Sequence, residues 1–421
     1  LSCINLNHTH EGFQRLTSVD EALARFLKSV ENRRFKTELV HVRQALDRVL
    51  AEDVVAQHEI PFFDRSVVDG FAVRSVVAEG ATKGKPSVLE IVGESRLGEV
   101  YKGIVGERCT VAVATGSIVP KGADTIVPIE DTLQLPERRI SLTRTAIRGQ
   151  NILRKGEDVC RGKIVLESGG RLRAQDLGVL KTLGTERVRV VKRPRVAVLS
   201  TGNELVETLR IRSSSQIVDI NRMVLSAKIN ELNGDVLDLG IVKDRKEVII
   251  STLKRAVKLS DLVLVSGGSS VGQRDLVPSC ISSLGKPGML VHGVAMRPAM
   301  PTGLASVNGT PIISLPGFPV SAMFAFLVFG RPMIAKLSGM KEVPESKREA
   351  MLAEPIKGWK SFRTFVRVTL KTTAGRLTAV PVESQRSSVI MSIVAADGFV
   401  TVPEDTGELP AGQIVEVTLL N

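Results

Sequence analysis

Between residues 196 and 337, short apolar segments alternate with helical segments, and this alternation constrains the fold more than any other feature of the chain. Residues 196–200, 236–242, 262–265 and 311–315 have the length and the apolar composition of buried strands. The helices predicted among them cover residues 221–232, 246–258, 275–284 and 319–337. Strands that alternate with helices form a parallel sheet, in which ligands bind at the carboxyl ends of the strands. The sequence therefore predicts an α/β domain with a site at that edge.

The segments on either side of this pattern predict further domains. Ser18 and Glu21 form a capping box at the start of an amphipathic helix, and residues 40–50 and 174–183 also have a helical pattern. Residues 54–151 are instead short strands and turns, which indicates a β-rich insertion. We therefore predict four domains. A helical N-terminal domain for linkage and dimerisation covers residues 1–55 and 152–190, and an inserted β-rich domain covers 56–151. An α/β domain at 191–340 and a C-terminal β-barrel at 341–421 follow.

The formal net charge of +12 raises the question of nucleic-acid binding. The basic residues are scattered, and aromatic residues make up only 4% of the chain, too few for a platform on which bases stack. A basic surface also attracts anionic substrates, so we predict a small-molecule ligand and no nucleic acid. The first residues lack the pattern of a signal peptide, and the longest apolar run, residues 322–329, is too short to cross a bilayer. We therefore expect a cytoplasmic protein with no membrane partner.

Polar and glycine-rich loops follow the predicted strands. Residues 266–272 have the sequence Ser-Gly-Gly-Ser-Ser-Val-Gly, in which glycines let backbone N–H groups approach an anion and serines add donors. Three acids, Glu204, Asp244 and Asp275, stand in or after three of these loops. Carboxylates opposite a phosphate group suit Mg²⁺. The candidate metal ligands are Glu204 and Asp275. The candidate phosphate-binding residues are Ser200, Thr201, Gly202, Ser266, Gly267, Gly268, Ser269, Ser270, Gly272, Pro316, Gly317 and Pro319.

Six motifs also stand in a fixed order along the chain. They are residues 61–74 (Pro-Phe-Phe-Asp-Arg-Ser-Val-Val-Asp-Gly-Phe-Ala-Val-Arg), 114–127 (Ala-Thr-Gly-Ser-Ile-Val-Pro-Lys-Gly-Ala-Asp-Thr-Ile-Val), 149–158 (Gly-Gln-Asn-Ile-Leu-Arg-Lys-Gly-Glu-Asp), 200–205 (Ser-Thr-Gly-Asn-Glu-Leu), 266–275 and 315–322 (Leu-Pro-Gly-Phe-Pro-Val-Ser-Ala). In this order they resemble the motifs of the MoeA/gephyrin E-domain family of molybdopterin molybdotransferases. The resemblance covers nearly the whole chain.

This resemblance implies a function. Members of the family accept adenylylated molybdopterin, hydrolyse the adenylate in a step that depends on Mg²⁺ and molybdate, and insert molybdenum, with release of AMP. This is the final step of molybdenum cofactor biosynthesis. The resemblance also implies an elongated homodimer whose active site is shared between subunits, and a possible handover of substrate from a molybdopterin adenylyltransferase. The catalytic residues that it implies are Asp69, Thr115 and Asp158 from the partner's β-rich domain, with Glu204, Asp244 and Asp275 from the α/β domain.

The resemblance further implies a subsite for molybdate or tungstate, at which this chain departs from its relatives. Many members have Lys-Pro-Gly-Lys-Pro where this chain has Arg297-Pro-Ala-Met-Pro301, so Met300 removes a cation and Ala299 occupies a glycine turn. The candidate oxyanion-binding residues are Arg297, Pro301, Ser321, Arg363, Arg367 and Ser387. These departures leave open a tungsten-inserting paralogue or weakened activity.

Three other functions stay open on the sequence, of which nucleic-acid binding rests on the net charge alone and is tested by a salt-dependent shift assay. The α/β domain alone resembles the adenylyltransferase that activates molybdopterin, although the motifs of the surrounding domains favour molybdenum insertion. A non-enzymatic scaffold that binds a partner peptide could also use this fold.

Overall fold

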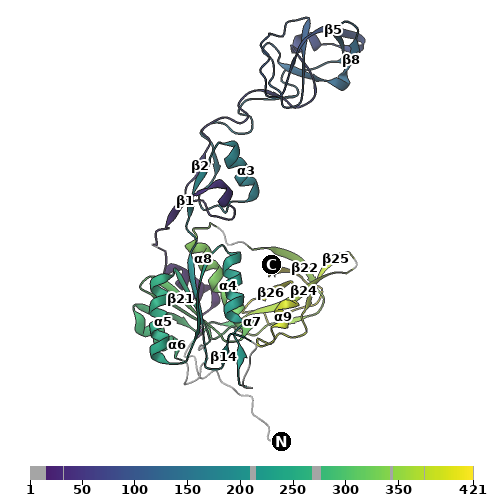
Figure 1. Cartoon of the computed structure of the whole chain (residues 1–421). Coiled ribbons are helices and arrows are strands. Elements are labelled where there is room, and N and C mark those ends of the chain that lie inside the picture. Colours follow the sequence, from purple (N-terminus) through teal and green to yellow (C-terminus); the bar gives the residue numbers. More distant parts are fainter. Residues whose placement is uncertain are drawn as a thin grey trace. The chain divides into compact units, whose positions relative to one another are not determined.

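The computed structural model describes residues 16–31, 33–208, 215–267, 276–341, 345–373 and 375–420. The chain divides into two compact units (Figure 1). The larger unit comprises Leu1–Ala51, Gly169–Ala174 and Arg187–Asn421, and the smaller unit comprises Glu52–Ser168 and Gln175–Glu186. The chain therefore leaves the larger unit and returns to it twice.

A six-stranded sheet forms the centre of the larger unit, in the order β16-β13-β17-β21-β20-β18. The four predicted strands are present and parallel: β16 (Asp235–Val242), β13 (Arg195–Thr201), β17 (Leu262–Ser266) and β21 (Thr310–Leu315). Two antiparallel strands that the sequence analysis missed, β20 (Gly303–Val307) and β18 (Pro287–His292), extend the sheet beyond β21. The sheet is therefore mixed, with its parallel part where the sequence predicts it.

Helices cover both faces of this sheet because alternate strand residues point to opposite sides. Val196 and Val198 pack in one core with α1 (Val19–Lys28), α4 (Asn221–Glu231), α7 (Pro319–Ala325) and α8 (Arg331–Leu337). On the other face, Ala197 and Leu199 pack with α5 (Lys246–Leu259) and α6 (Val277–Leu284). Figure 1 shows α5 and α6 together on one side of β21 and α4 with α8 on the other.

The segment Pro319–Leu337 is long and apolar enough to cross a membrane by length and composition. It consists of α7, a π-helical turn (Phe326–Gly330) and α8, and 72% of its most apolar window is buried inside the fold. Phe324, Phe326 and Phe329 are buried in the core beside the sheet. The segment is a core helix of the larger unit.

The prediction of a helical N-terminal domain is wrong. Helix α1 forms as the capping box predicts, but its apolar face packs into the core of the α/β sheet. Residues 40–50 contain the end of β1 (Thr37–His41) and a short 3₁₀ turn (Val42–Gln44). Strand β1 pairs antiparallel with β12 (Arg187–Val191), and this pairing with a distant segment overrides the local helical pattern. Helix α3 (Ala174–Thr182) is present as predicted.

The smaller unit is mostly strands, as the sequence predicts for its inserted part. Its six-stranded sheet has the order β7-β4-β6-β5-β9-β8 and a core that includes Phe71, Leu89, Val127 and Ile140. The strands are β4 (Gly70–Val73), β5 (Thr82–Ser95), β6 (Cys109–Val113), β7 (Thr125–Pro128), β8 (Thr132–Leu135) and β9 (Arg139–Arg144). Two short antiparallel pairs, β2 (Val54–Val55) with β11 (Ile164–Leu166) and β3 (Arg65–Ser66) with β10 (Ile152–Leu153), complete it with α2 (Ser75–Ala78) and α3.

The C-terminal residues form a closed β-barrel, as predicted. Its strands follow the order β24-β25-β22-β28-β26, and a pairing of β26 with β24 closes it. Their bounds are β22 (Lys347–Leu352), β24 (Arg363–Thr373), β25 (Arg376–Pro381), β26 (Gly398–Val402) and β28 (Ile414–Leu419). Strand β19 (Met296–Arg297) of the α/β domain adds to β24, and Phe324 contacts the barrel rings Phe365 and Phe399 at centroid distances of 5.4 and 5.2 Å. These contacts fix the barrel against the α/β domain.

Candidate functional site

The loops that follow β13 and β16 are joined by reciprocal hydrogen bonds at the carboxyl edge of the sheet. The Asn203 backbone N–H donates to Asp244 Oδ2 at 3.2 Å, and the Asp244 N–H donates to Asn203 Oδ1 at 3.3 Å. The side chains of Glu204 and Asp244 are exposed. Glu204 and Asp244 therefore follow the carboxyl ends of two neighbouring parallel strands.

Glycines bring the backbones of three loops close together at the same edge. Gly267 has φ +92°, and a Cβ on it would lie 2.4 Å from the Thr201 carbonyl oxygen, so a larger residue would force the loops apart. Gly202 donates its N–H to Val242 O at 3.2 Å, and Gly267 donates to Leu315 O at 3.1 Å. The loops after β13, β17 and β21 therefore approach each other closely, and the N–H groups of Gly202 and Gly267 are used to join them.

Asn221, which the sequence analysis did not select, ties these loops together. It lies at the start of α4, and its Nδ2 donates to Ser266 Oγ and to Gly317 O, both at 2.8 Å. Asn221 is buried. The sequence does carry a signal for it, because it is a polar residue at the first position of a predicted helix that begins beside the sheet edge. Asn221 positions two of the predicted phosphate-binding residues.

Several hydroxyls at this edge have no hydrogen-bond partner within the described part of the chain. They are Ser200 Oγ, Thr201 Oγ1 and Ser314 Oγ, all buried. Buried hydroxyls are normally hydrogen-bonded, so these groups are available to a ligand. Gly268, Ser269, Ser270, Gly272 and Asp275 lie outside the described residues, and their roles stay predictions.

No group of three or more His, Cys, Asp or Glu side chains with metal-binding geometry occurs among the residues that the structure describes. Glu204 and Asp244 supply the exposed carboxylates at the sheet edge, and the third predicted acid, Asp275, is not described. A magnesium site made by Glu204 and Asp275 therefore stays a prediction.

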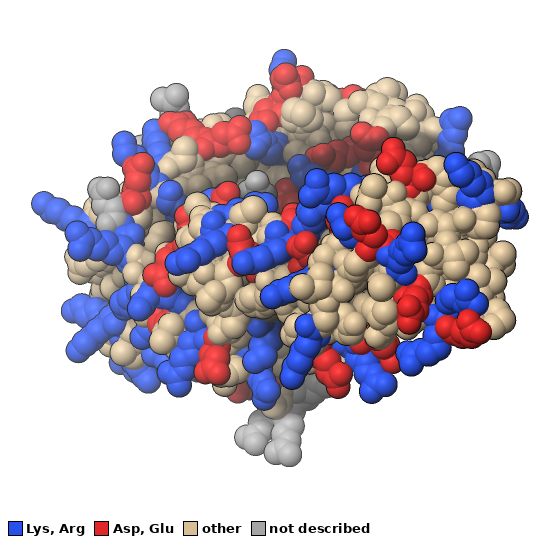
Figure 2. All heavy atoms as spheres, turned by 90° about the horizontal axis from the view of Figure 1, so that it is seen from above, with Lys and Arg blue, Asp and Glu red and all other residues tan. Residues whose placement is uncertain are grey.

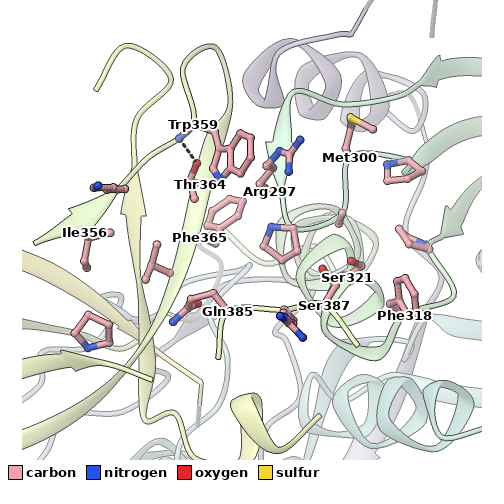
Figure 3. A pocket seen from close by; sticks show the side chains of 18 of the residues that line it. Arg297, Met300, Phe318, Ser321, Ile356, Trp359, Thr364, Phe365, Gln385 and Ser387 are labelled. Atoms are coloured by element: carbon pink, nitrogen blue, oxygen red, sulfur yellow. Dashed lines mark hydrogen bonds between the residues drawn. The ribbon is translucent and has the colours of Figure 1, made fainter. Parts of the chain in front are cut away.

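A cavity of about 800 Å³ lies between the α/β domain and the barrel (Figure 3). The α/β domain contributes residues 297–301, Pro316, Phe318 and Ser321 to its wall. The barrel contributes a second set, which includes Trp359, Thr364, Phe365, Gln385, Arg386 and Ser387. Four of the predicted oxyanion-binding residues line it together: Arg297, Pro301, Ser321 and Ser387.

Aromatic rings, rather than a carboxylate, hold the side chain of Arg297. Its guanidinium carbon lies 3.8 Å from the centroid of the Trp359 ring and 5.2 Å from that of Phe362. Figure 3 shows Arg297 between Trp359 and Met300. Burial lowers the pKa of Arg297, and its Nε has no hydrogen-bond partner among the described residues. Stacking stabilises the cation and leaves its N–H groups for an anion.

The turn that follows Arg297 keeps a glycine-like conformation without glycine. Ala299 has φ +82°, and Thr302 Oγ1 donates to its carbonyl oxygen at 2.7 Å. Met300 accepts the Val294 N–H at its carbonyl oxygen at 2.9 Å and lines the cavity with its side chain. The backbone of the turn is therefore intact, and Met300 brings no charge to the cavity.

Ser321 and Ser387 lie next to each other because their two loops are joined. The Val320 N–H, in the first turn of α7, donates to Ser387 O at 3.2 Å. Figure 3 shows the two serine side chains beside each other on the cavity wall. Their hydroxyls are neutral donors that complement the charge of Arg297.

The two predicted barrel arginines have different surroundings. Arg363 makes two hydrogen bonds to Asp20, at 2.7 and 2.8 Å, and lies 3.1 Å from Glu404, so nearby carboxylates balance its charge. Arg363 is not among the residues that line the cavity. Its side chain instead fixes the start of α1 to the barrel.

Arg367 is completely buried, and the described residues give it no carboxylate partner. Its Nη2 donates to Ser384 O at 3.2 Å, while Nε and Nη1 have no partner. Burial lowers the pKa of Arg367 to about 10. Gln385, which lines the cavity, holds the Arg367 backbone through Oε1 at 3.0 Å and Nε2 at 2.9 Å. An uncompensated cation therefore lies next to the cavity wall.

In the smaller unit, Asp69 and Thr115 lie together. Asp69 Oδ1 accepts from the Thr115 N–H at 2.7 Å and from its hydroxyl at 2.9 Å. These two donors hold the pKa of Asp69 below its usual range. Asp158 is exposed beside the Ile60–Val159 bridge and shares no hydrogen bond with these two described residues.

Charge is spread widely over the surface. Figure 2 shows Lys and Arg side chains across the whole visible face, with Asp and Glu between them. The scattered distribution that the sequence indicates is therefore seen on this face.

The fold is that of a multidomain α/β protein with polar loops at the carboxyl edge of its sheet and a cavity between that domain and the barrel. Three family models match it: "MoeA N-terminal region (domain I and II)" at residues 17–184, "Probable molybdopterin binding domain" at 197–336 and "MoeA C-terminal region (domain IV)" at 349–420. The chain belongs to the MoeA family, which confirms the assignment made from its motifs.

Named relatives match over most of their length. The molybdopterin molybdenumtransferase of Bacillus subtilis (strain 168) is 33% identical over 409 residues, which are 96% of this chain and 94% of that protein. The protein of the same name from Staphylococcus aureus (strain MSSA476) is 32% identical over 383 residues, 90% of each chain. The crystal structure of a molybdopterin biosynthesis moeA protein from Pyrococcus horikoshii OT3 has a TM-score of 0.85 and 30% identity, covering 96% of this chain and all of that one.

Proposed function

We propose that this chain is a molybdopterin molybdenumtransferase, an enzyme that inserts molybdenum into molybdopterin in the final step of molybdenum cofactor biosynthesis. Its relatives with that name support this activity over at least 90% of the chain. The observation that carries the proposal is Arg297, which stacks on Trp359 and has no carboxylate partner among the described residues, in a cavity that Ser321 and Ser387 also line. A cation with neutral donors beside it suits a tetrahedral oxyanion.

The pterin substrate, adenylylated molybdopterin, would bind at the carboxyl edge of the sheet. The hydroxyls of Ser200 and Thr201, which have no partner among the described residues, would hold its phosphate groups, and the glycines at 202, 267 and 317 would let the ligand approach the backbone closely. Asn221 would keep this cradle in shape through its bonds to two of the loops. The anionic adenylate would thus be oriented for hydrolysis.

The exposed carboxylates at this edge fit Mg²⁺, which prefers oxygen ligands and keeps several of its waters. Glu204, with Asp275, would hold the ion, and Asp244 would orient the loop through its bonds to Asn203. When bound, Mg²⁺ would neutralise charge on the adenylate phosphates. In the hydrolysis, water adds to phosphorus, the phosphoanhydride bond breaks and AMP leaves.

Molybdate, the second substrate, would occupy the cavity beside the barrel. Arg297 would balance its charge and Ser321 and Ser387 would donate hydrogen bonds, while Arg367, buried behind the cavity wall, would add positive charge at longer range. Tungstate has the same charge and shape, so it would compete for the same groups.

The enzyme would act as a cytoplasmic homodimer with a shared site. Asp69 and Thr115, which the structure holds as a hydrogen-bonded pair on an exposed surface, would complete the site of the partner subunit. The pterin would come from a molybdopterin adenylyltransferase by direct handover.

The test is the release of AMP from adenylylated molybdopterin by the purified chain, measured against Mg²⁺, molybdate and tungstate. We expect release to require Mg²⁺ and to rise with the oxyanion. Glu204→Gln should lose most activity with an unchanged thermal transition, whereas Glu349→Gln, an exposed carboxylate on the barrel, should behave as wild type. Full turnover in EDTA contradicts the metal role, and formation of adenylylated molybdopterin from ATP would instead identify an adenylyltransferase.

A further inference from the structure

A second polar cavity, of about 540 Å³, lies at the opposite edge of the α/β sheet, where its strands begin. Arg195, Asp235 and Thr310, the first residues of β13, β16 and β21, line it. Residues 33–36 and residues 192–195 contribute three cations each, and Lys258 adds another. The proposed function uses none of these residues.

Charge in this cavity is strongly unbalanced. Its two carboxylates already have partners: Asp261 forms an ion pair with Arg33 and accepts the Arg195 N–H at 2.8 Å, and Asp235 lies 4.0 Å from Arg193. The cations that remain without a carboxylate partner among the described residues are Arg34, Lys36, Lys192, Arg195 and Lys258. Like charges that converge in this way favour a bound anion.

Backbone hydrogen bonds hold the basic segments in place. The Lys192 N–H donates to Lys36 O at 2.8 Å, which joins the two segments. The Asp261 N–H donates to Arg195 O at 2.7 Å, and the Asp235 N–H donates to Pro194 O at 2.9 Å. The backbone that carries the cations is therefore preorganised, which lowers the entropy cost of binding.

An aromatic ring also lines the cavity. Phe35 is 50% exposed, and it packs beside Gly339, where a Cβ would lie 3.4 Å from the Phe35 ring and from Val191. A half-exposed ring between cations can stack with a base or another flat group.

Helix ends explain only one of the unpaired cations. Lys258 lies in the last turn of α5, where a positive charge interacts favourably with the helix dipole. Arg34, Lys36 and Lys192 lie outside any helix or strand. A ligand therefore accounts for the cluster better than helix capping does.

We propose that this cavity is a second anion site, which binds an oligophosphate group, either free or carried by a nucleotide. Its volume lies in the range of small-molecule sites, about 300–1,000 Å³. It stands at the edge of the sheet opposite the proposed pterin site, so the two sites are separate in space.

Calorimetric titration of the full chain with inorganic tripolyphosphate tests this site. We expect saturable binding at this cavity, beside any binding of phosphate groups at the proposed pterin site, with an affinity that falls with salt. The double variant Arg34→Ala/Lys192→Ala should bind at least tenfold more weakly. The matched control is Lys83→Ala/Lys85→Ala, which removes two exposed cations on β5 and should bind as wild type. Arg297→Ala should also bind tripolyphosphate as wild type, which would exclude the cavity beside the barrel as the binding site.

Titration with ADP separates the two sources of the phosphate group. If ADP binds more tightly than pyrophosphate and Phe35→Ala removes this difference, the natural ligand is a nucleotide. If the two bind equally, the ligand is a free oligophosphate. The proposal is overturned if tripolyphosphate shows no saturable binding, if the double variant binds it as tightly as wild type, or if only an acidic polypeptide or a nucleic acid binds. AMP release from adenylylated molybdopterin, measured in parallel, tests the proposed function, so failure of one measurement does not affect the other.

Discussion

Replacing Arg367 with methionine should make the protein more stable and less active. The side chain is fully buried, two of its nitrogens have no partner among the described residues, and burial lowers its pKa to about 10. The folded chain therefore carries a cation that water would solvate better in the unfolded chain. Removing a buried charge without a partner removes this cost.

The size of the gain follows from the pKa. Each pKa unit corresponds to about 1.4 kcal/mol, so the charged form costs the folded state about 3 kcal/mol. Losing the bond to Ser384 O and some side-chain volume offsets part of this, which leaves a gain of about 1–2 kcal/mol. For a domain of this size, the thermal transition should rise by about 2–6 °C.

The pH dependence has a fixed sign. Because the folded pKa is lowered, the arginine is charged in both states below pH 10, so the full cost is present at neutral pH. The cost declines as pH rises through about 10, where the folded chain releases the proton. The advantage of Arg367→Met should therefore be constant around neutrality and shrink in alkali.

Differential scanning calorimetry with and without molybdate measures both effects. At molybdate 100 times its Kd, wild type should gain about 2.7 kcal/mol, and Arg367→Met much less. Arg376→Met, an exposed arginine on β25, is the control and should change neither quantity. If Arg367→Met loses more than about 1 kcal/mol, or if molybdate stabilises both proteins equally, Arg367 has a structural role and the reasoning is refuted.

Three further predictions concern other parts of the molecule. Met300→Lys should lower the half-saturating molybdate concentration by about tenfold to a hundredfold, because an ammonium adds a charge-assisted hydrogen bond; an unchanged value in a molybdate titration excludes this position as a ligand. Mixing inactive Asp69→Ala and Asp275→Ala subunits should restore about one competent site per heterodimer if the site is shared, and mixtures without AMP release contradict sharing. Phe324→Ala should destabilise the larger unit by about 3–5 kcal/mol in denaturant unfolding, and a loss below about 1 kcal/mol would show that the ring does not hold the barrel.

The sequence predicted the strands that carry the site because their apolar runs are short, continuous and bounded by turns. β13, β16, β17 and β21 all lie where the pattern places them. It could not predict β18 and β20, since Pro287, Gly288 and Gly303 weaken the strand pattern and the pairing with β21 supplies the missing preference. The helix expected at residues 40–50 failed for the same reason, because β1 finds its partner about 150 residues later.

Within the candidate site, the sequence found charges but not their partners. Arg363 and Arg367 stand four residues apart on one strand, yet Asp20 neutralises the first and the described residues leave the second without a carboxylate. The stacking of Trp359 on Arg297 joins segments about 60 residues apart, and no local pattern indicates it. Residue types are visible in a sequence, whereas pairing depends on the folded chain.

Helix α1 packs on a core whose other residues are synthesised much later, and this order affects how the protein folds during synthesis. Val19, Ala22 and Phe26 bury against strands and helices from residues 196–337, and the whole of the smaller unit lies between them in the sequence. At about 5–20 residues per second, the apolar face of α1 waits about 15–60 s on the ribosome for these partners. During that interval it is a hydrophobic helix without a core, and the smaller unit can finish folding first. Chaperone capture of the nascent chain should therefore begin with α1 and end only after α8 emerges.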